Sequence, residues 1–194
     1  RRMVDERAGT DYDPIATLDA LGERISSSAA ADSSLSVEWV ETDVRTGGHV
    51  AHLSRAYHTL DFEPAMLGTF GEPPVEPFRE EFSDRHMTSF GEPGYTDAVE
   101  FRDGKLMLPE LEGPRSIDWD RVTERCPPEE LATHLDGAAL LGLGYLTDLP
   151  GLPGIADGLR TEVWPLLSEP PETVLVDPGD VRKLSSDQLR TGLD

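Results

Sequence analysis

Lysine is almost absent from this 194-residue sequence, in which only Lys105 and Lys183 occur. Arginine supplies the rest of the 17 basic residues, against 38 aspartates and glutamates, so the formal net charge is -21. A surface this negative repels the phosphates of nucleic acids and the anionic headgroups of membranes. The charge therefore argues against nucleic acids and membranes as partners.

The excess of carboxylates also makes the ionic strength of the surroundings important. Like charges oppose compaction at ordinary salt concentration, whereas at about 1 M salt the screening length falls to roughly 3 Å. Scarce lysine beside abundant arginine and acid resembles the composition of proteins from extreme halophiles. We expect a native state that loosens at low ionic strength and that molar salt stabilises by screening the surface charge.

Cysteine and long apolar runs are scarce as well. Cys126 is the single cysteine, so no internal disulfide can form within the chain, which favours a reducing cytoplasm. Pro127 and Pro128 follow it and no histidine is near in sequence, so we interpret Cys126 as a structural thiol. No apolar run reaches the roughly 18 residues of a membrane span, and residues 1–7 lack a signal-peptide core. We expect one main soluble domain over residues 1–194.

Helical and strand-like patterns alternate along the chain. Apolar residues indicate helices at 49–60, 75–82, 118–125, 128–135, 155–167 and 185–193. Strand-like segments lie at 35–44, 64–70, 95–101, 106–111 and 173–176, and the small polar run 26–34 is expected to be a loop. No apolar strand is visible between Arg1 and Gly9.

These elements predict an α/β fold with two parts. Strands that alternate with helices imply a layered sheet with helices on both faces. The exposed segment 35–46 and the hairpin 95–111, whose turn contains Asp103-Gly104, are expected to form a separate polar-faced sheet. The second sheet would be a small β lid on the α/β body.

Two glycines open the helix expected at 49–60. Gly47 and Gly48 follow the strand-like segment 35–44 and precede the first turn of that helix. Glycine lets a ligand approach the backbone closely, and the free amides of a first helical turn face such a ligand. The pattern predicts a site for a polar substrate, although a flexible turn would have the same sequence.

The order of elements resembles the ribokinase-like, or phosphofructokinase B, family of sugar kinases. Asp11-Tyr12-Asp13 resembles the Asn-x-Asp opening of the family, in which the second acid, here Asp13, binds sugar hydroxyls. Gly47-Gly48-His49-Val50-Ala51-His52 resembles its Gly-Gly-x-x-x-Asn signature, with His52 in the place of asparagine. The resemblance implies that Asp13, Gly47, Gly48 and His52 bind the substrate.

Two further motifs extend the resemblance toward the phosphate side. Residues 68–72 are similar to the Gly-x-x-Gly-Asp turn of the family, with Glu72 replacing aspartate. Asp177 stands where the family has a strand ending in Asp-Pro near the path of the phosphate. The resemblance implies a three-layer α/β/α body with a β-sheet lid, and transfer of a phosphoryl group from ATP or ADP, with Mg²⁺, to a hydroxyl of a sugar or nucleoside.

One departure concerns the catalytic residue. The Gly-Ala-Gly-Asp segment that supplies the catalytic aspartate and an anion hole in the family does not occur here. We therefore assign no catalytic residue, and we interpret the chain as the amino-terminal two-thirds of a kinase whose C-terminal part is missing. The alternative is a non-catalytic sugar-binding or dimerising protein of the same fold.

The predicted lid has two possible roles. We expect it to close over the sugar, to pair with a second subunit in a homodimer, or both.

Two competing readings of the motifs receive less support. His49 and His52 are three residues apart, a spacing that can hold zinc with His58 or His86 as a third ligand, but without Cys or a His-Glu-x-x-His pattern such pairs are more often surface residues. We assign no metal site and interpret His134 as structural. Residues 142–147 resemble a dinucleotide fingerprint but end in threonine, so we expect Gly142 and Gly144 to permit close packing instead.

Overall fold

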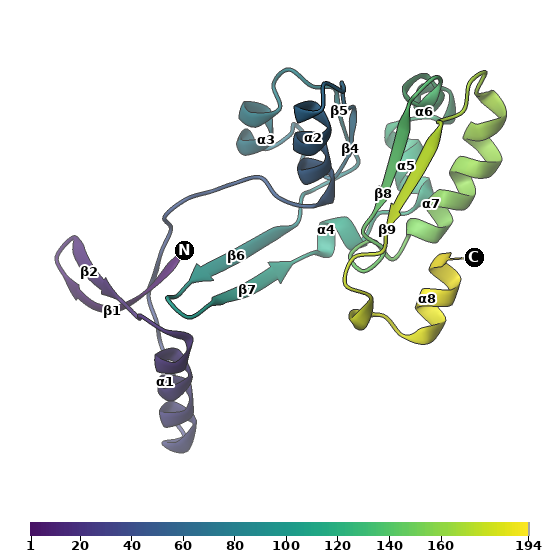
Figure 1. Ribbon diagram of the computed structural model, residues 1–194. Coiled ribbons are helices and arrows are strands. Elements are labelled where there is room, and N and C mark those ends of the chain that lie inside the picture. Colours follow the sequence, from purple (N-terminus) through teal and green to yellow (C-terminus); the bar gives the residue numbers. More distant parts are fainter. Residues whose placement is uncertain (194) are drawn as a thin grey trace. The chain divides into compact units, whose positions relative to one another are not determined.

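The computed structural model describes residues 1–193, which fall into two compact units (Figure 1). The first unit comprises residues 1–45 and 95–110, and the second comprises residues 46–94 together with the described residues from 111 onward. Helices and strands are mixed in both, in agreement with the predicted α/β class. Within residues 1–193 no helix has the length and apolarity needed to cross a membrane.

The first unit combines a three-stranded sheet, a hairpin and one helix. β1 (Arg2–Ala8) lies between β2 (Asp11–Pro14) and β3 (Trp39–Val40) and is antiparallel to both. β6 (Tyr95–Glu100) and β7 (Lys105–Glu110) form an antiparallel hairpin, closed where the Phe101 amide donates to the Gly104 carbonyl at 2.9 Å. The hairpin predicted at 95–111 is confirmed.

Three predictions for the first unit are wrong. The strand expected at 35–44 shortens to β3. β3 pairs with β1 and not with the hairpin, so the described strands of 35–46 and 95–111 lie in separate sheets instead of the single sheet that was expected. Only Val4 of β1 is buried, so hydrogen bonds to β2 and β3 define this strand, while its side chains carry no apolar pattern. Helix α1 (Leu18–Ala30), capped by Thr17, continues through residues 26–30 of the expected loop, since alanine favours a helix and serine opposes it only weakly.

The second unit contains two pairs of parallel strands. β4 (Met66–Gly68) pairs with β5 (Met87–Ser89), and α3 (Glu76–Glu81) lies between them in sequence. β8 (Leu140–Gly144) pairs with β9 (Thr173–Asp177). The connection from β8 to β9 is α7 (Leu152–Gly158), continued by a π-helical turn over Leu159–Val163 and a 3-10 turn over Trp164–Leu166. Pro165 lies in that last turn, which confirms that the helix ends there.

All but one of the remaining helices of this unit agree closely with the predicted ranges. They are α2 (His49–Thr59), α4 (Glu112–Arg115), α5 (Trp119–Arg125), α6 (Pro128–Leu135) and α8 (Ser186–Leu193), with a 3-10 turn at Val181–Lys183. Ser185 caps α8 by accepting a hydrogen bond from the Gln188 amide at 3.2 Å. α4 is a short helix that the sequence pattern did not indicate.

Two apolar clusters hold the second unit together. The larger joins α5, α6 and α7 around fully buried Cys126 and Val163, and the smaller packs Ala51 of α2 against Met66 of β4. Each fully buried large side chain stabilises the fold by about 1.5 to 3 kcal/mol. These clusters fix the helices against the strand pairs that carry the candidate site.

The buried face of α2 differs from the predicted stripe. Val50, Leu53, Tyr57 and Leu60 were expected to be buried, yet Leu60 is 64% exposed and the buried residues of the helix are His49, Ala51 and Ser54. Short side chains on this face let the helix approach the strands closely, and the longer apolar ones lie at its margins. The strand predicted at 173–176, whose apolar run was expected to be buried, is present as β9, but four of its five residues are exposed in a sheet of two strands.

Candidate functional site

The loop that enters α2 has a backbone conformation that only glycine adopts easily. Gly48 is the residue before the helix, with φ of 86° and ψ of 167°. L-residues almost never occupy this region. No side chain of the described residues caps the first turn of α2, and Gly47 and Gly48 are both exposed. The first amides of α2 are therefore open donors beside a stretch of bare backbone, as the Gly-Gly pattern predicted.

Helix α2 packs directly on β8 at two glycines. A Cβ atom at Gly142 would lie 3.0 Å from Cδ1 of Leu53, and one at Gly144 would lie 2.8 Å from the Asp177 carbonyl oxygen and 3.0 Å from Nε2 of His49. Side chains at these positions would push the helix away from the strand. The predicted role of Gly142 and Gly144 in close packing is confirmed, although the partner is a helix.

This packing brings the start of α2 to the carboxyl ends of two parallel strands. Gly144 and Asp177 are the last residues of β8 and β9 and are partners in register. Oδ1 of Asp177 accepts a hydrogen bond from the Gly179 amide at 2.9 Å, and Oδ2 lies 3.5 Å from Nδ1 of His49. Open α/β sheets bind ligands at the carboxyl ends of their strands. Asp177, with a side chain 41% exposed, can face such a ligand.

His49 connects the glycine loop to this strand end. Its side chain is only 7% exposed, and its ring centroid lies 4.7 Å from that of Tyr145, just after β8. Burial lowers the pKa of His49, and the nearby Asp177 carboxylate offsets only part of this shift. The imidazole is therefore neutral at pH 7. Nε2 of His49 is buried without a hydrogen-bond partner among the described residues.

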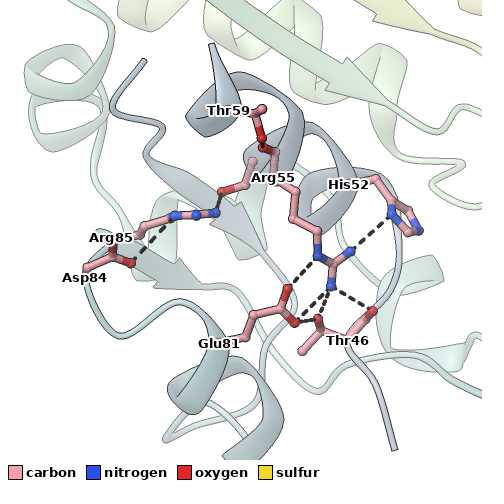
Figure 2. A network of polar contacts seen from close by, with 8 residues as sticks. Thr46, His52, Arg55, Thr59, Glu81, Asp84 and Arg85 are labelled. Atoms are coloured by element: carbon pink, nitrogen blue, oxygen red, sulfur yellow. Dashed lines mark hydrogen bonds and ion pairs between the residues drawn. The ribbon is translucent and has the colours of Figure 1, made fainter. Parts of the chain in front are cut away.

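A network of polar contacts fixes the loop from its other side (Figure 2). Nη2 of Arg55, on α2, donates to the Thr46 carbonyl at 3.0 Å and to Oε2 of Glu81, on α3, at 2.9 Å. The Thr46 hydroxyl also contacts Arg55 and donates to Glu81. Thr46, the residue before Gly47, is thus hydrogen-bonded to both α2 and α3.

The ion pair in this network depends on pH. The hydrogen bond from Arg55 lowers the pKa of Glu81 from 4.5 to about 2, and that from Thr46 adds to the effect. A lowered carboxyl pKa stabilises the folded state above the unfolded pKa, and this stability is lost as the pH falls toward the folded pKa. The contribution should be complete above about pH 4.5 and should disappear near pH 2.

We predict that Glu81→Gln lowers the melting temperature at pH 7 by a few degrees, because partly exposed ion pairs contribute about 0.2 to 1 kcal/mol. The difference from the wild type should shrink between pH 4.5 and pH 2. Melts of the intact protein followed by circular dichroism measure it, with Glu80→Gln on the same helix as the control. A difference that does not change with pH would show that Glu81 acts by packing and not by charge.

The structure gathers four of the predicted site residues in one unit. Gly47, Gly48 and Asp177 lie at the meeting point of α2, β8 and β9. His52 is exposed one turn into α2, with Nδ1 3.1 Å from Nη1 of Arg55. Asp13 belongs to the first unit, where it is an exposed residue of β2 opposite Glu6.

The zinc alternative gains no support at α2. Nδ1 of His52 faces the Arg55 cation, which opposes a metal ion, and the buried Nδ1 of His49 faces Asp177.

The roles of Tyr145, Arg55 and Glu81 were not foreseen. Arg55 and Glu81 are 26 residues apart, and no motif joins them. Glu72 of the turn after β4 is held by the Arg125 guanidinium at 2.6 Å, a second long-range pair without a sequence signal.

Comparison with known proteins identifies the family. The family model for prokaryotic ketohexokinase matches residues 1–194. A protein from Haloferax volcanii named "Ketohexokinase" is 49% identical over 195 residues, which is 100% of this chain and 52% of that protein. The chain thus spans about half the length of the curated relative it matches, a smaller share than the expected two-thirds. No solved structure matches the chain. A match of the family model over all 194 residues places the chain in the prokaryotic ketohexokinase family.

Proposed function

We propose that the intact protein is a sugar kinase that transfers a phosphoryl group from ATP, with Mg²⁺, to a hydroxyl of a ketohexose. The family and the name of the Haloferax volcanii protein support the reaction class and the ketohexose. We propose further that the body has the ribokinase-like three-layer architecture, of which the parallel pairs β4–β5 and β8–β9 are part. ADP is the alternative phosphoryl donor.

One observation carries the assignment of the site. His49, the residue after the Gly47-Gly48 pair, lies 3.5 Å from Asp177 at the carboxyl end of β9. His49 in the sugar motif and Asp177 in the phosphate-side motif are 128 residues apart in sequence. The two motifs nevertheless meet in space. A kinase needs its acceptor hydroxyl and its donor phosphate at one place, and these two motifs supply the two sides.

The residues present fit the demands of phosphoryl transfer, which are positioning and electrostatic stabilisation. The open amides after Gly48 can donate to sugar oxygens, and the lack of side chains allows a close approach. Asp177 offers the hard carboxylate oxygen that Mg²⁺ prefers, and its bond from Gly179 fixes its orientation. Mg²⁺ would neutralise charge on the phosphates. Neutral His49 adds no charge of its own beside them.

An activity assay tests this function. Purified intact protein in molar KCl with ATP and Mg²⁺ should form ADP and a sugar phosphate with fructose, a ketohexose, and much less with glucose, an aldohexose. Asp177→Asn should lower kcat strongly and leave the affinity for fructose in calorimetry nearly unchanged. Fructose binding without formation of a sugar phosphate, with either ATP or ADP as the donor, would contradict the kinase and favour the non-catalytic sugar-binding protein.

Asp13 provides a second prediction, which rests on the family resemblance. Replacing it with alanine removes one partner of charge-assisted hydrogen bonds to sugar hydroxyls, which costs about 1.5 to 3 kcal/mol. The affinity for the ketohexose should fall by roughly 10- to 150-fold in calorimetry, with an unchanged melting temperature. Asp11→Ala, on the same face of β2, is the matched control. Equal affinities of the two variants would remove Asp13 from the site.

Three further proposals concern the setting of this activity. The residues of the expected lid, 35–46 and 95–111, lie almost entirely in the first unit, which we propose closes over the sugar or pairs with a second subunit in a homodimer. The net charge supports work at high salt. The single cysteine supports a cytoplasmic location.

A further inference from the structure

A second group of side chains in the second unit has metal-binding chemistry and no part in the proposed kinase site. Cys126 ends α5, and Glu130 and His134 follow at intervals of four residues on α6. One ligand atom from each, a thiol sulfur, a carboxylate oxygen and an imidazole nitrogen, lies within 4.8 Å of the other two. Among the described residues these are the His, Cys, Asp and Glu side chains that come together in this way.

Burial sets this group apart from the acidic surface. Cys126 is 0% exposed, His134 is half-buried, and Glu130 is exposed, so the cluster runs from the core outward. Nε2 of His134 is buried and has no hydrogen-bond partner in the described part of the chain. A buried polar atom without a partner is costly, and a bound ion is one way to satisfy it.

A fourth candidate ligand lies beside His134. The His86 ring, just before β5, has its centroid 4.4 Å from that of His134. Nε2 of His86 lies 3.0 Å from the Thr88 hydroxyl, and the tautomer that donates to Thr88 leaves a lone pair on Nδ1. Histidine ligands of metals are commonly held by such a bond from their second nitrogen.

We propose that Cys126, Glu130, His134 and His86 form a structural zinc site. Zinc prefers four ligands of the thiolate, imidazole and carboxylate types at about 2.0 to 2.3 Å. Ligand atoms around such an ion are roughly 3.5 Å apart, so modest rotations of Glu130 and His134 would close the cluster of three around it. His86 would supply the fourth ligand through Nδ1. A site with four protein ligands has no open position, which marks it as structural.

The free thiol carries a proton that zinc would have to displace. Burial raises the pKa of Cys126 to about 11, so the thiol carries its proton at pH 7 when no metal is bound. Burial and the neighbouring His86 lower the pKa of His134, so this imidazole is neutral and can donate its lone pair. Zinc binding would therefore exchange the thiol proton for the metal, which gives a measurable proton release.

The site would join parts of the unit that are distant in sequence. His86 precedes β5, Cys126 lies at the junction of α5 and α6, and His134 lies in the last turn of α6. The bound ion would tie α6 to the β4–β5 strand pair. A ligand that binds only the folded state raises the melting temperature, so the proposed zinc should stabilise this unit.

Zinc titration of the intact protein tests the proposal. The protein is stripped with a chelator and titrated in molar KCl with millimolar Mg²⁺, which occupies surface carboxylates but does not compete for thiolate. Calorimetry in two buffers of different ionisation enthalpy should show one tight zinc per chain with release of about one proton. Cobalt should give a thiolate charge-transfer band in the near ultraviolet, and zinc should raise the melting temperature.

Variants separate this site from adventitious binding. Cys126→Ser and His134→Gln should each weaken zinc binding by about 100-fold or more and abolish the shift in melting temperature, and Cys126→Ser should remove the cobalt band. His58→Gln, which changes an exposed histidine of α2, should leave all three readouts intact. If Cys126→Ser does not fold, His134→Gln and the wild-type cobalt spectrum still decide. No charge-transfer band, or zinc affinity equal in all variants, would overturn the site and indicate surface carboxylates only.

Discussion

Raising KCl from 0.1 M to 3 M should increase the melting temperature of the intact protein steeply. The chain has 38 acidic residues against 17 basic ones, so 21 carboxylates remain even if every arginine and lysine is paired. Salt at about 1 M reduces the screening length to roughly 3 Å and weakens their repulsion. It also weakens surface ion pairs such as Arg160 with Asp157, but exposed pairs contribute only about 0 to 1 kcal/mol each. Circular dichroism melts measure the net effect.

A charge variant separates screening from other effects of salt. The triple substitution Glu23→Gln, Glu80→Gln and Glu172→Gln removes three exposed carboxylates from three different segments. It should raise the melting temperature at 0.1 M KCl and change it little at 3 M, where the repulsion is already screened. A melting temperature that is flat or falls with KCl in the wild type would contradict the account of the charge.

Replacing Gly48 with valine should have the largest effect of any substitution in the α2 loop. A Cβ at Gly48 meets no described atom within 4 Å, so the cost comes only from the backbone, whose φ of 86° suits glycine. Backbone strain of this kind costs about 1 to 3 kcal/mol, and a β-branched residue belongs at the upper end. The chain either keeps the strained loop and loses stability, or relaxes it and loses ketohexose affinity by up to roughly 150-fold.

Two measurements on one protein therefore test the loop. Melts of Gly48→Val measure the loss in the free energy of unfolding, and calorimetry measures the loss in the free energy of sugar binding. The sum of the two losses should be about 3 kcal/mol. Gly47→Val is the matched control for backbone strain, because a Cβ there also meets no described atom within 4 Å and the backbone of Gly47 is not in the left-handed region, so its melting temperature should stay near that of the wild type. If both variants bind the sugar as tightly and melt at the same temperature as the wild type, the conformation of Gly48 has no functional role.

Local patterns predicted those elements whose signals are themselves local. The hairpin 95–111 follows from Asp103-Gly104 between two apolar runs, and α6 begins at Pro128 with acidic residues in its first turn, as predicted. The Gly47-Gly48 pair marked the loop for the same reason, since the backbone conformation of one residue selects glycine. Where a single residue or turn determines the structure, the sequence was sufficient.

Elements that depend on distant partners were not predictable in this way. β1 has almost no apolar side chains facing a core, so its two neighbouring strands define it, and β3 is short because only two residues reach β1. The contact of Arg55 with Glu81 is likewise a product of packing between α2 and α3. Cys126, Glu130 and His134 likewise come together across the junction of α5 and α6, where Cys126 has an extended backbone, and no sequence pattern marked them as a group.

A crystal structure of the intact protein with a ketohexose and a non-hydrolysable ATP analogue would test the central claim most directly. The account predicts that sugar hydroxyls accept hydrogen bonds from the first amides of α2 after Gly48, and that the phosphates lie near Asp177 at the carboxyl ends of β8 and β9. A sugar bound elsewhere, with the Gly47-Gly48 loop and Asp177 facing only water, would contradict it.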